Sequence, residues 1–256
     1  MNQPLLFLTE VYSAIQGEGP LVGVRQIFVR LSGCDIRCAW CDTPGSLEKT
    51  QYCTYEISEG RRQFTKVANP ISVEYLVEIL SQLNPFMHHS ISFTGGEPLL
   101  QSKSLISVFK AIKSKFEIPV YLETGGHRVE NLKDVVDCID YLSMDFKLPS
   151  SSSTKPMWDK HEEFLQIALA SENLKNIWIK IVVTKDTLMD DLFKAIDIVK
   201  SIKLNKNTEI ILQPVTEIND IKPPEPDELL KMHSVLLKVY PCIRVLPQVH
   251  RLIGQL

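Results

Sequence analysis

Three cysteines lie close together in the sequence Cys34-Asp-Ile-Arg-Cys38-Ala-Trp-Cys41, directly after the apolar segment 26–31. Thiolates bind iron–sulfur clusters, normally four to a cubane cluster, and a structural zinc ion also takes four protein ligands. Three thiols in one loop would leave one iron of a cluster open to a substrate or cofactor. The spacing therefore indicates a metal site, with zinc completed by a distant histidine, or a chance grouping, as the alternatives.

Other polar residues near this loop could bind a ligand. Arg30 lies inside the apolar segment, where an arginine is seldom buried unpaired, so it either reaches outward or faces a carboxylate in a pocket. Residues 15–20, Ile-Gln-Gly-Glu-Gly-Pro, predict a tight turn whose backbone can approach a ligand closely. Asp42 and Thr43 follow the third cysteine and could bind a hard cation such as magnesium or cap a turn.

The rest of the chain alternates between short apolar strands and amphipathic helices, the first of which has Ser72 as its expected cap. The predicted strands are residues 24–31, 90–93, 120–122, 141–144, 177–183, 209–212 and 243–246, and the predicted helices are about 72–83, 101–116, 129–138, 159–171, 188–202 and 226–239. Outside this alternation we expect a strand or extended arm over 5–13, an irregular insertion or hairpin over 42–70, and a loop over the serine-rich tract 149–156.

This order of elements predicts an α/β fold, a partial, TIM-like (β/α)6 barrel with an irregular insertion after the cysteine loop, in a single domain over residues 1–256. Parallel α/β barrels bind their ligands at the carboxyl ends of the strands. The polar motifs that follow the predicted strands are Thr94 to Pro98, Glu123-Thr124, Ser143 to Lys147, Gln213, and Gln248 with His250. We expect these groups and the cysteine loop to form a ring around one mouth of the barrel.

Gly95-Gly96-Glu97 in this ring has two interpretations. The glycines could offer a flat edge to a ligand, or they could only satisfy the dihedral angles of a turn. Glu97 could likewise contact the ligand or hold the turn through backbone N–H groups.

Composition limits the class of protein. With 44% hydrophobic residues the chain can build a sizeable core, and a net charge of −3 without a basic run predicts no nucleic-acid partner. The first residues lack the basic segment of a signal peptide, and no apolar stretch reaches transmembrane length, so we expect no membrane association. Cys53, Cys138 and Cys242 are scattered, which predicts reduced thiols and a cytoplasmic location.

With Trp40 before the third cysteine, the loop resembles the signature of the radical S-adenosylmethionine (SAM) superfamily, and Gly-Gly-Glu-Pro at 95–98 matches a second superfamily motif. In that superfamily the open iron chelates the amino and carboxylate groups of SAM. The resemblance implies a barrel of the radical SAM type, a 4Fe-4S cluster held by Cys34, Cys38 and Cys41, and SAM as a second cofactor.

The resemblance narrows to the 7-carboxy-7-deazaguanine synthase family. The motifs that carry it are residues 15–19, 28–34, 38–43, 94–98, 213–214 and 244–250, which span nearly the whole chain. It implies ring contraction of 6-carboxy-5,6,7,8-tetrahydropterin to 7-carboxy-7-deazaguanine with loss of ammonia, in 7-deazapurine (queuosine, preQ0) biosynthesis. Family members are homodimers that also use magnesium and regenerate SAM, and the cluster needs an electron-donor protein such as flavodoxin.

The family resemblance also implies roles for individual residues, with Thr43 as the magnesium ligand. The implied pterin-binding residues are Ile15, Gln16, Gly17, Arg30, Thr94 and His250. The implied SAM-site residues are Trp40, Asp42, Gly96, Ser143, Asp145, Lys147, Gln213, Pro214, Val215 and Thr216. Arg30 offers a fixed fork for the substrate carboxylate, and Gln16 can read the amide-like edge of a pterin.

One departure from the family leaves a choice open. Many members have Ser-Pro-Lys where this chain has Ser143-Met-Asp-Phe-Lys147, so the sequence does not decide which of Ser143, Asp145 and Lys147 contacts SAM. Two other functions also stay open. One is an activase that places a glycyl radical on a partner protein, and the other is a non-enzymatic iron–sulfur or zinc-binding protein.

Overall fold

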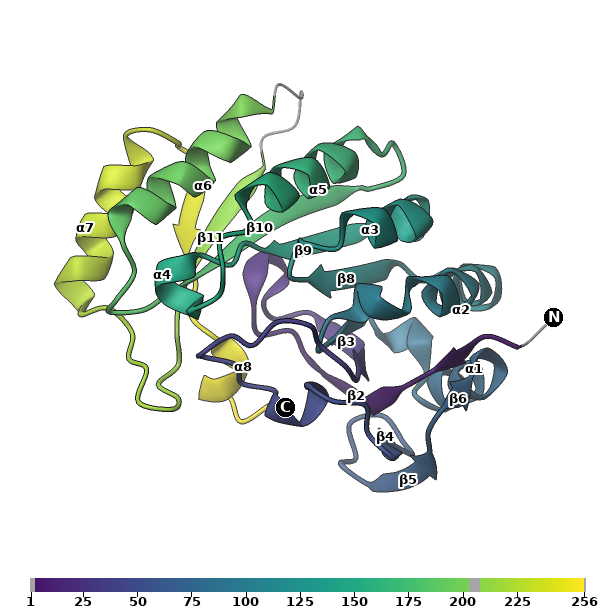
Figure 1. The fold of residues 1–256 in the computed structure, drawn as a ribbon. Coiled ribbons are helices and arrows are strands. Elements are labelled where there is room, and N and C mark those ends of the chain that lie inside the picture. Colours follow the sequence, from purple (N-terminus) through teal and green to yellow (C-terminus); the bar gives the residue numbers. More distant parts are fainter. Residues whose placement is uncertain (1–2, 203–207, 256) are drawn as a thin grey trace.

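A curved sheet of ten strands, in the order β12-β11-β10-β9-β8-β7-β3-β2-β4-β5, carries the fold (Figure 1). The computed structural model describes residues 3–202 and 208–255, so residues 1–2, 203–207 and 256 of the predicted single domain lie outside this description. In this order the strands from β12 to β3, namely β12, β11, β10, β9, β8, β7 and β3, are parallel to one another, whereas β2 is antiparallel to β3. Within the described residues β12 and β5 do not pair, so the sheet stays open as a partial barrel.

The strands are β1 (Leu5–Leu6), β2 (Leu8–Ile15), β3 (Arg25–Leu31), β4 (Tyr52–Glu56), β5 (Phe64–Ala68), β6 (Ile71–Ser72), β7 (Ser90–Gly95), β8 (Val120–Thr124), β9 (Tyr141–Asp145), β10 (Asn176–Val183), β11 (Glu209–Pro214) and β12 (Ile243–Val245). The helices are α1 (Val73–Gln82), α2 (Ser102–Phe116), α3 (Val129–Val135), α4 (Pro149–Ser152), α5 (Trp158–Ala170), α6 (Met189–Ser201), α7 (Pro226–Leu237) and α8 (Val249–Leu252). None of the helices in the described ranges is long and apolar enough to span a bilayer.

Six helices follow the parallel strands in turn, which confirms the predicted (β/α)6 order. They are α1, α2, α3, α5, α6 and α7, and Figure 1 shows α2, α3, α5 and α6 side by side over one face of the sheet. Local signals set their ends: the Ser72 hydroxyl accepts a hydrogen bond from Tyr75 N at 3.2 Å, and Glu225 with Glu228 forms a capping box before α7.

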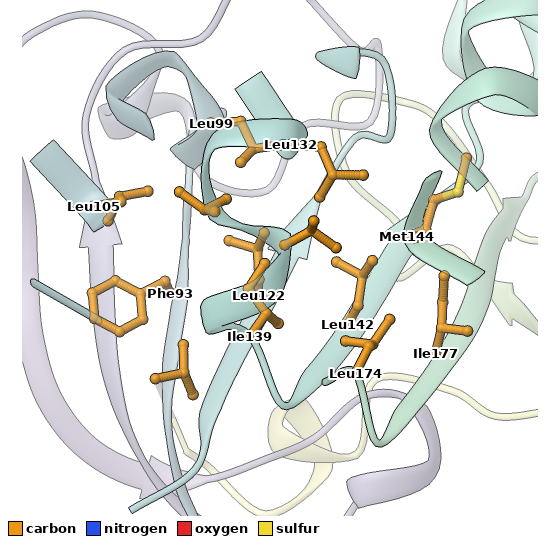
Figure 2. Close-up of a cluster of buried hydrophobic side chains, with 14 of the residues drawn as sticks. Phe93, Leu99, Leu105, Leu122, Leu132, Ile139, Leu142, Met144, Leu174 and Ile177 are labelled. Atoms are coloured by element: carbon orange, nitrogen blue, oxygen red, sulfur yellow. The ribbon is translucent and has the colours of Figure 1, made fainter. Parts of the chain in front are cut away.

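Side-chain alternation gives the parallel strands one apolar and one polar face. Successive residues of a strand point to opposite faces, so Phe93, Leu122 and Leu142 pack toward the helices, as Figure 2 shows with Leu105 and Leu132 opposite them. The alternate positions are largely polar. Those that line a cavity inside the barrel are Arg30, Thr94, Glu123, Ser143, Asp145, Lys180 and Gln213.

Two predictions about irregular segments can now be resolved. The predicted insertion contains the hairpin β4–β5, which extends the sheet beyond β2. The prediction of a loop throughout 149–156 was wrong, because Pro149–Ser152 forms the single turn α4. Proline suits the first position of a helix, and the Ser152 hydroxyl donates to Leu148 O at 2.6 Å, so the tract closes a turn despite its composition.

Candidate active site

A cavity of about 460 Å³ lies at the carboxyl ends of the parallel strands and brings the predicted ring together. The predicted site residues that line it are Ile15, Gln16, Gly17, Arg30, Cys34, Cys38, Trp40, Cys41, Asp42, Thr43, Thr94, Gly96, Ser143, Asp145, Lys147, Gln213, Val215, Thr216 and His250. Pro214 is not among the lining residues, so its SAM contact stays a prediction. The cavity therefore joins, at one place, residues from positions 15 to 250.

The cysteine loop crosses the mouth of this cavity and is held from two sides. Ala39 N donates to Ser152 O of α4 at 2.9 Å, and Cys34 N donates to Leu47 O at 3.0 Å. Burial raises the pKa of Cys34 to about 11 and also raises the pKa of Cys38. Binding of Cys34 and Cys38 to a metal centre must therefore displace a proton from both thiols.

The chemistry of the three thiols suits an iron–sulfur cluster. All three are half-buried and line the same cavity. Among the described residues, no three His, Cys, Asp or Glu side chains come close enough to hold one metal ion. A zinc site needs ligands that converge on one point, whereas each cysteine of a cubane cluster binds a different iron. Three thiols that line one cavity suit a 4Fe-4S cluster with one iron left open.

The Gly95-Gly96 turn lies directly behind the loop. A Cβ at Gly95, whose φ is +124°, would collide with the Leu31 carbonyl oxygen, and a Cβ at Gly96 would collide with that of Gly33. Glu97 is 1% exposed and accepts hydrogen bonds from Leu99 N at 3.0 Å and Gly125 N at 2.9 Å. Close backbone packing requires the glycines, and Glu97 holds the turn.

One wall of the cavity is built from the ends of β9 and β11 with Trp40. Lys147 Nζ lies 2.7 Å from Asp145 Oδ2 and 4.1 Å from the centre of the Trp40 ring. Asp145 Oδ1, Gln213 Oε1 and Trp40 Nε1 are buried without a hydrogen-bond partner among the described residues. Buried polar atoms normally have partners, so unpaired ones that line a cavity suit a polar ligand. The sequence did not decide which of Ser143, Asp145 and Lys147 contacts SAM, and all three line this cavity.

A second part of the cavity wall carries Arg30 and Gln16. The Arg30 side chain is 15% exposed, and its Nε donates to Glu10 Oε1 at 2.6 Å while its Nη2 donates to the Tyr12 hydroxyl at 2.8 Å. Gln16 Nε2 donates to Glu123 Oε1 at 2.9 Å. The second interpretation of Arg30 is correct, because it faces both a carboxylate and the cavity.

The C-terminal residues close over the turn at 15–17. Val249 N donates to Gly17 O at 2.9 Å, and a Cβ at Gly17 would collide with His250. His250 lines the cavity, and burial lowers the pKa of its imidazole. Close contact between these two segments explains a glycine at this position.

Sequence reasoning placed Glu123 in the ring without a role, and among the polar cavity residues it missed Glu10, Tyr12 and Lys180. Burial raises the pKa of Glu123, whose carboxyl group lies within 3.5 Å of the Thr94 hydroxyl. Lys180 is the only charged residue in the strand sequence Asn-Ile-Trp-Ile-Lys-Ile-Val-Val. Arg30 was singled out because it is a charged residue inside an apolar strand. The same criterion applied to residues 176–183 would have identified Lys180.

Comparison with known proteins shows the family of this chain. Residues 28–216 match the Radical SAM superfamily, and the chain belongs to that superfamily. It is 38% identical, over 100% of both chains, to the 7-carboxy-7-deazaguanine synthase of Geobacter sulfurreducens, and 30% identical to that of Archaeoglobus fulgidus over 96% of this chain and 97% of the relative. Within the superfamily, the chain belongs to the 7-carboxy-7-deazaguanine synthase family.

Solved structures show the same fold. The crystal structure of QueE from Escherichia coli has a TM-score of 0.60, with 19% identity, 95% of this chain covered and 94% of that one. Family membership confirms the radical SAM resemblance and makes a 4Fe-4S cluster and SAM the cofactors of this class of enzyme. It excludes the glycyl-radical activase and the non-enzymatic metal-binding protein as readings of the sequence.

Proposed function

We propose that this protein contracts the ring of 6-carboxy-5,6,7,8-tetrahydropterin to 7-carboxy-7-deazaguanine and releases ammonia, in 7-deazapurine biosynthesis. Its membership of the synthase family supports the proposal. The observation that carries it is one cavity that joins three cluster-type thiols to a largely buried arginine able to bind an acid. Substrate and products balance without net oxidation or reduction, which fits an enzyme that regenerates its SAM.

We assign Cys34, Cys38 and Cys41 to the cluster, which with SAM supplies the radical that starts the reaction. For SAM itself, the acceptor atoms Asp145 Oδ1 and Gln213 Oε1 suit amino or hydroxyl groups. The other residues proposed for the SAM site are Trp40, Asp42, Gly96, Ser143, Lys147, Val215 and Thr216, which line the same cavity, and Pro214 beside them.

The substrate is proposed to bind against Arg30 and the turn at residues 15–17, with Thr94 and His250. Arg30 keeps N–H groups that neither Glu10 nor Tyr12 uses, and these can pair with the pterin carboxylate. Gln16 and Glu123 can read the amide-like edge of the pterin because their polar atoms line the same wall. A cavity of about 460 Å³ is of a size that suits a small-molecule substrate.

Magnesium is proposed to bind at Thr43, whose hydroxyl lies 4.0 Å from Cys41 Sγ at the cavity wall. Magnesium takes few protein oxygens and keeps several waters, so a hydroxyl and the substrate carboxylate are suitable ligands. Bound there, it would offset the charge of the carboxylate. Full turnover in the presence of a strong magnesium chelator would refute this assignment.

We also propose the larger context of the enzyme: a single domain over 1–256, a homodimer, a cytoplasmic location and an electron donor such as flavodoxin. The six cysteines are all unpaired, which suits a reducing compartment. A hollow of about 630 Å³ beside the cluster loop, lined by Asp35, Arg37 and residues 154–160, offers a place for a donor protein. Light scattering and reduction by purified flavodoxin test the homodimer and the donor.

The experiment that tests the proposed reaction uses protein whose cluster has been reconstituted without oxygen. It is incubated with SAM, magnesium, a chemical reductant and the carboxylated tetrahydropterin, and the products are identified by mass spectrometry. We expect 7-carboxy-7-deazaguanine and ammonia in equal amounts. An intact cluster that cleaves SAM but yields neither product would refute the proposal.

A further inference from the structure

Lys180 is a largely buried cation without a role in the reaction as described so far. It lies on β10 with its side chain 13% exposed, and Trp178 and Val182 flank it on the same inward face of the strand. Trp178 lies under the turn that holds Gln16, because a Cβ at Gly19 would come within 2.8 Å of its Nε1. Val182 packs with Trp40. This face of β10 therefore runs from the part of the cavity wall near Gln16 to the part near Trp40, with Lys180 in the middle.

The ammonium group of Lys180 contacts both parts of the cavity wall directly. Its Nζ lies 2.5 Å from Glu18 Oε2, in the turn at 15–20, and 3.3 Å from Asp145 Oδ2, at the end of β9. Asp145 in turn pairs with Lys147, which lies over the Trp40 ring. A single buried charge thus joins the substrate turn to the aromatic residue of the cluster loop.

Glu18 makes a second connection on its other oxygen. Its Oε1 accepts from Gln248 Nε2 at 2.7 Å, and the same nitrogen donates to Asp42 Oδ2 at 2.9 Å. Asp42 directly follows the last cysteine of the loop. Within the turn, Glu18 N donates to Gln16 Oε1 at 3.0 Å. The Lys180–Glu18 pair therefore helps to fix Gln16 relative to both sides of the cluster loop.

The pair stays ionised at neutral pH. Burial alone would raise the pKa of Glu18, but the charge of Lys180 and its hydrogen bond outweigh burial and lower that pKa to about 2. Burial would lower the pKa of Lys180, but Glu18 and Asp145 raise it well above its usual value. An ammonium held this firmly cannot accept a proton at neutral pH, so Lys180 is not a general base.

We propose that Lys180 is a positioning residue, which sets the distance between bound pterin and SAM by tying the turn at 15–20 to Asp145. The inference rests on the proposed function. A pterin displaced from SAM reacts less often with the radical, so loss of this contact should weaken pterin binding and waste SAM. The positioning depends on the charge interactions of Lys180 with Glu18 and Asp145, and not on the volume of its side chain.

The test compares Lys180→Met with the wild-type protein and with Lys200→Met, an exposed lysine of α6. Pterin and SAM affinities are measured by calorimetry on anaerobic, reconstituted protein, and 5′-deoxyadenosine released per product is measured in turnover. For Lys180→Met we expect normal cluster content, pterin binding weaker by about tenfold and more 5′-deoxyadenosine per product. Lys200→Met should match the wild type. Unchanged pterin affinity together with an unchanged ratio in Lys180→Met would overturn the proposal.

Two further variants keep the test decisive if Lys180→Met does not fold. Lys180→Arg keeps the charge and should bind pterin more tightly than Lys180→Met. If Lys180→Met cannot be obtained, the pterin affinity of Lys180→Arg should lie within about threefold of that of the wild type. Glu18→Gln with Lys180→Met removes both charges, so its loss of affinity should be smaller than the sum of the single losses. A foldable double variant with wild-type affinity and ratio would refute the positioning role. Absence of product from the wild type would instead refute the proposed reaction, since the binding measurements do not depend on turnover.

Discussion

At the scale of single residues, Arg30 is ordered before a substrate binds. Its contacts with Glu10 and the Tyr12 hydroxyl fix the plane of the guanidinium, and Tyr12 is itself stacked on Phe28 with ring centres 5.4 Å apart. A guanidinium group held in one orientation loses little conformational entropy when it binds a carboxylate. Glu10 also balances the buried charge in the absence of substrate. Arg30 can therefore recognise an acid without rearranging the wall.

We predict that Arg30→Lys raises the KM for the pterin by about 10-fold to 100-fold, the loss expected for a charge-assisted hydrogen bond. Lysine keeps the charge but cannot contact Glu10, Tyr12 and a carboxylate with one planar group. Steady-state kinetics measure the effect, and Arg244→Lys on the exposed part of β12 is the control. An unchanged KM would show that the carboxylate binds elsewhere.

At the scale of elements, the turn after β7 places the cluster loop against the sheet. Gly96 N donates to Leu31 O at 3.0 Å and Glu97 N donates to Gly33 O at 2.9 Å. These bonds join the end of β7 to the segment that leads into Cys34. Because the backbones are in contact, the turn has no room for a Cβ at either glycine.

Replacing Gly95 by alanine should therefore lower the stability of the fold and loosen the loop. A left-handed φ costs an alanine about 1–3 kcal/mol, and the collision with the Leu31 carbonyl adds to this. Gly45→Ala is a matched control, because its Cβ would meet no atom within 4 Å. Urea unfolding and the iron content after reconstitution measure the two effects. Equal stability of the two variants would contradict the packing described for this turn.

Helices and strands were predictable from sequence because caps and periodicity mark them locally. Ser72 identified the start of α1, and α2 was predicted at 101–116 and observed at Ser102–Phe116. The pairing partners of Lys180 could not be read in the same way, since Glu18 and Asp145 come from distant segments that only the sheet order brings together. The contact between Gly17 and His250 could not be predicted either, because the two residues lie at opposite ends of the chain.

At the scale of the whole molecule, one buried histidine links stability to pH. His161 on α5 is fully buried, with its Nε2 donating to Gly125 O at 3.1 Å and its ring centre 4.2 Å from that of Phe146. Its Nδ1 has no hydrogen-bond partner among the described residues, so protonation would place an unpaired N–H in the core. Burial accordingly lowers the pKa of His161 to about 4, from 6.5.

A histidine with a lowered pKa stabilises the fold above its unfolded pKa and loses this contribution as pH falls. Between pH 6.5 and 5 the loss from His161 is about 2 kcal/mol, at 1.36 kcal/mol per pH unit. We predict that His161→Phe loses less stability between pH 7 and pH 5 than the wild type by about this amount. Urea unfolding of both proteins at the two pH values measures the difference. Equal losses would mean that His161 is protonated without cost in the fold.

The open, curved sheet gives the molecule its function by separating two environments. Apolar side chains fill the space between strands and helices (Figure 2), while the inward faces of the same strands hold charged and polar groups that line one cavity. Residues of the cluster loop and of the C-terminal segment line that cavity together with the strand ends.

The most direct test of this account is a crystal structure of the reconstituted protein with SAM and the carboxylated tetrahydropterin. We predict a 4Fe-4S cluster on Cys34, Cys38 and Cys41, SAM against Asp145 and Gln213, and the pterin carboxylate within hydrogen-bonding distance of Arg30. A zinc ion on the three thiols, or a pterin bound away from Arg30, would contradict the account.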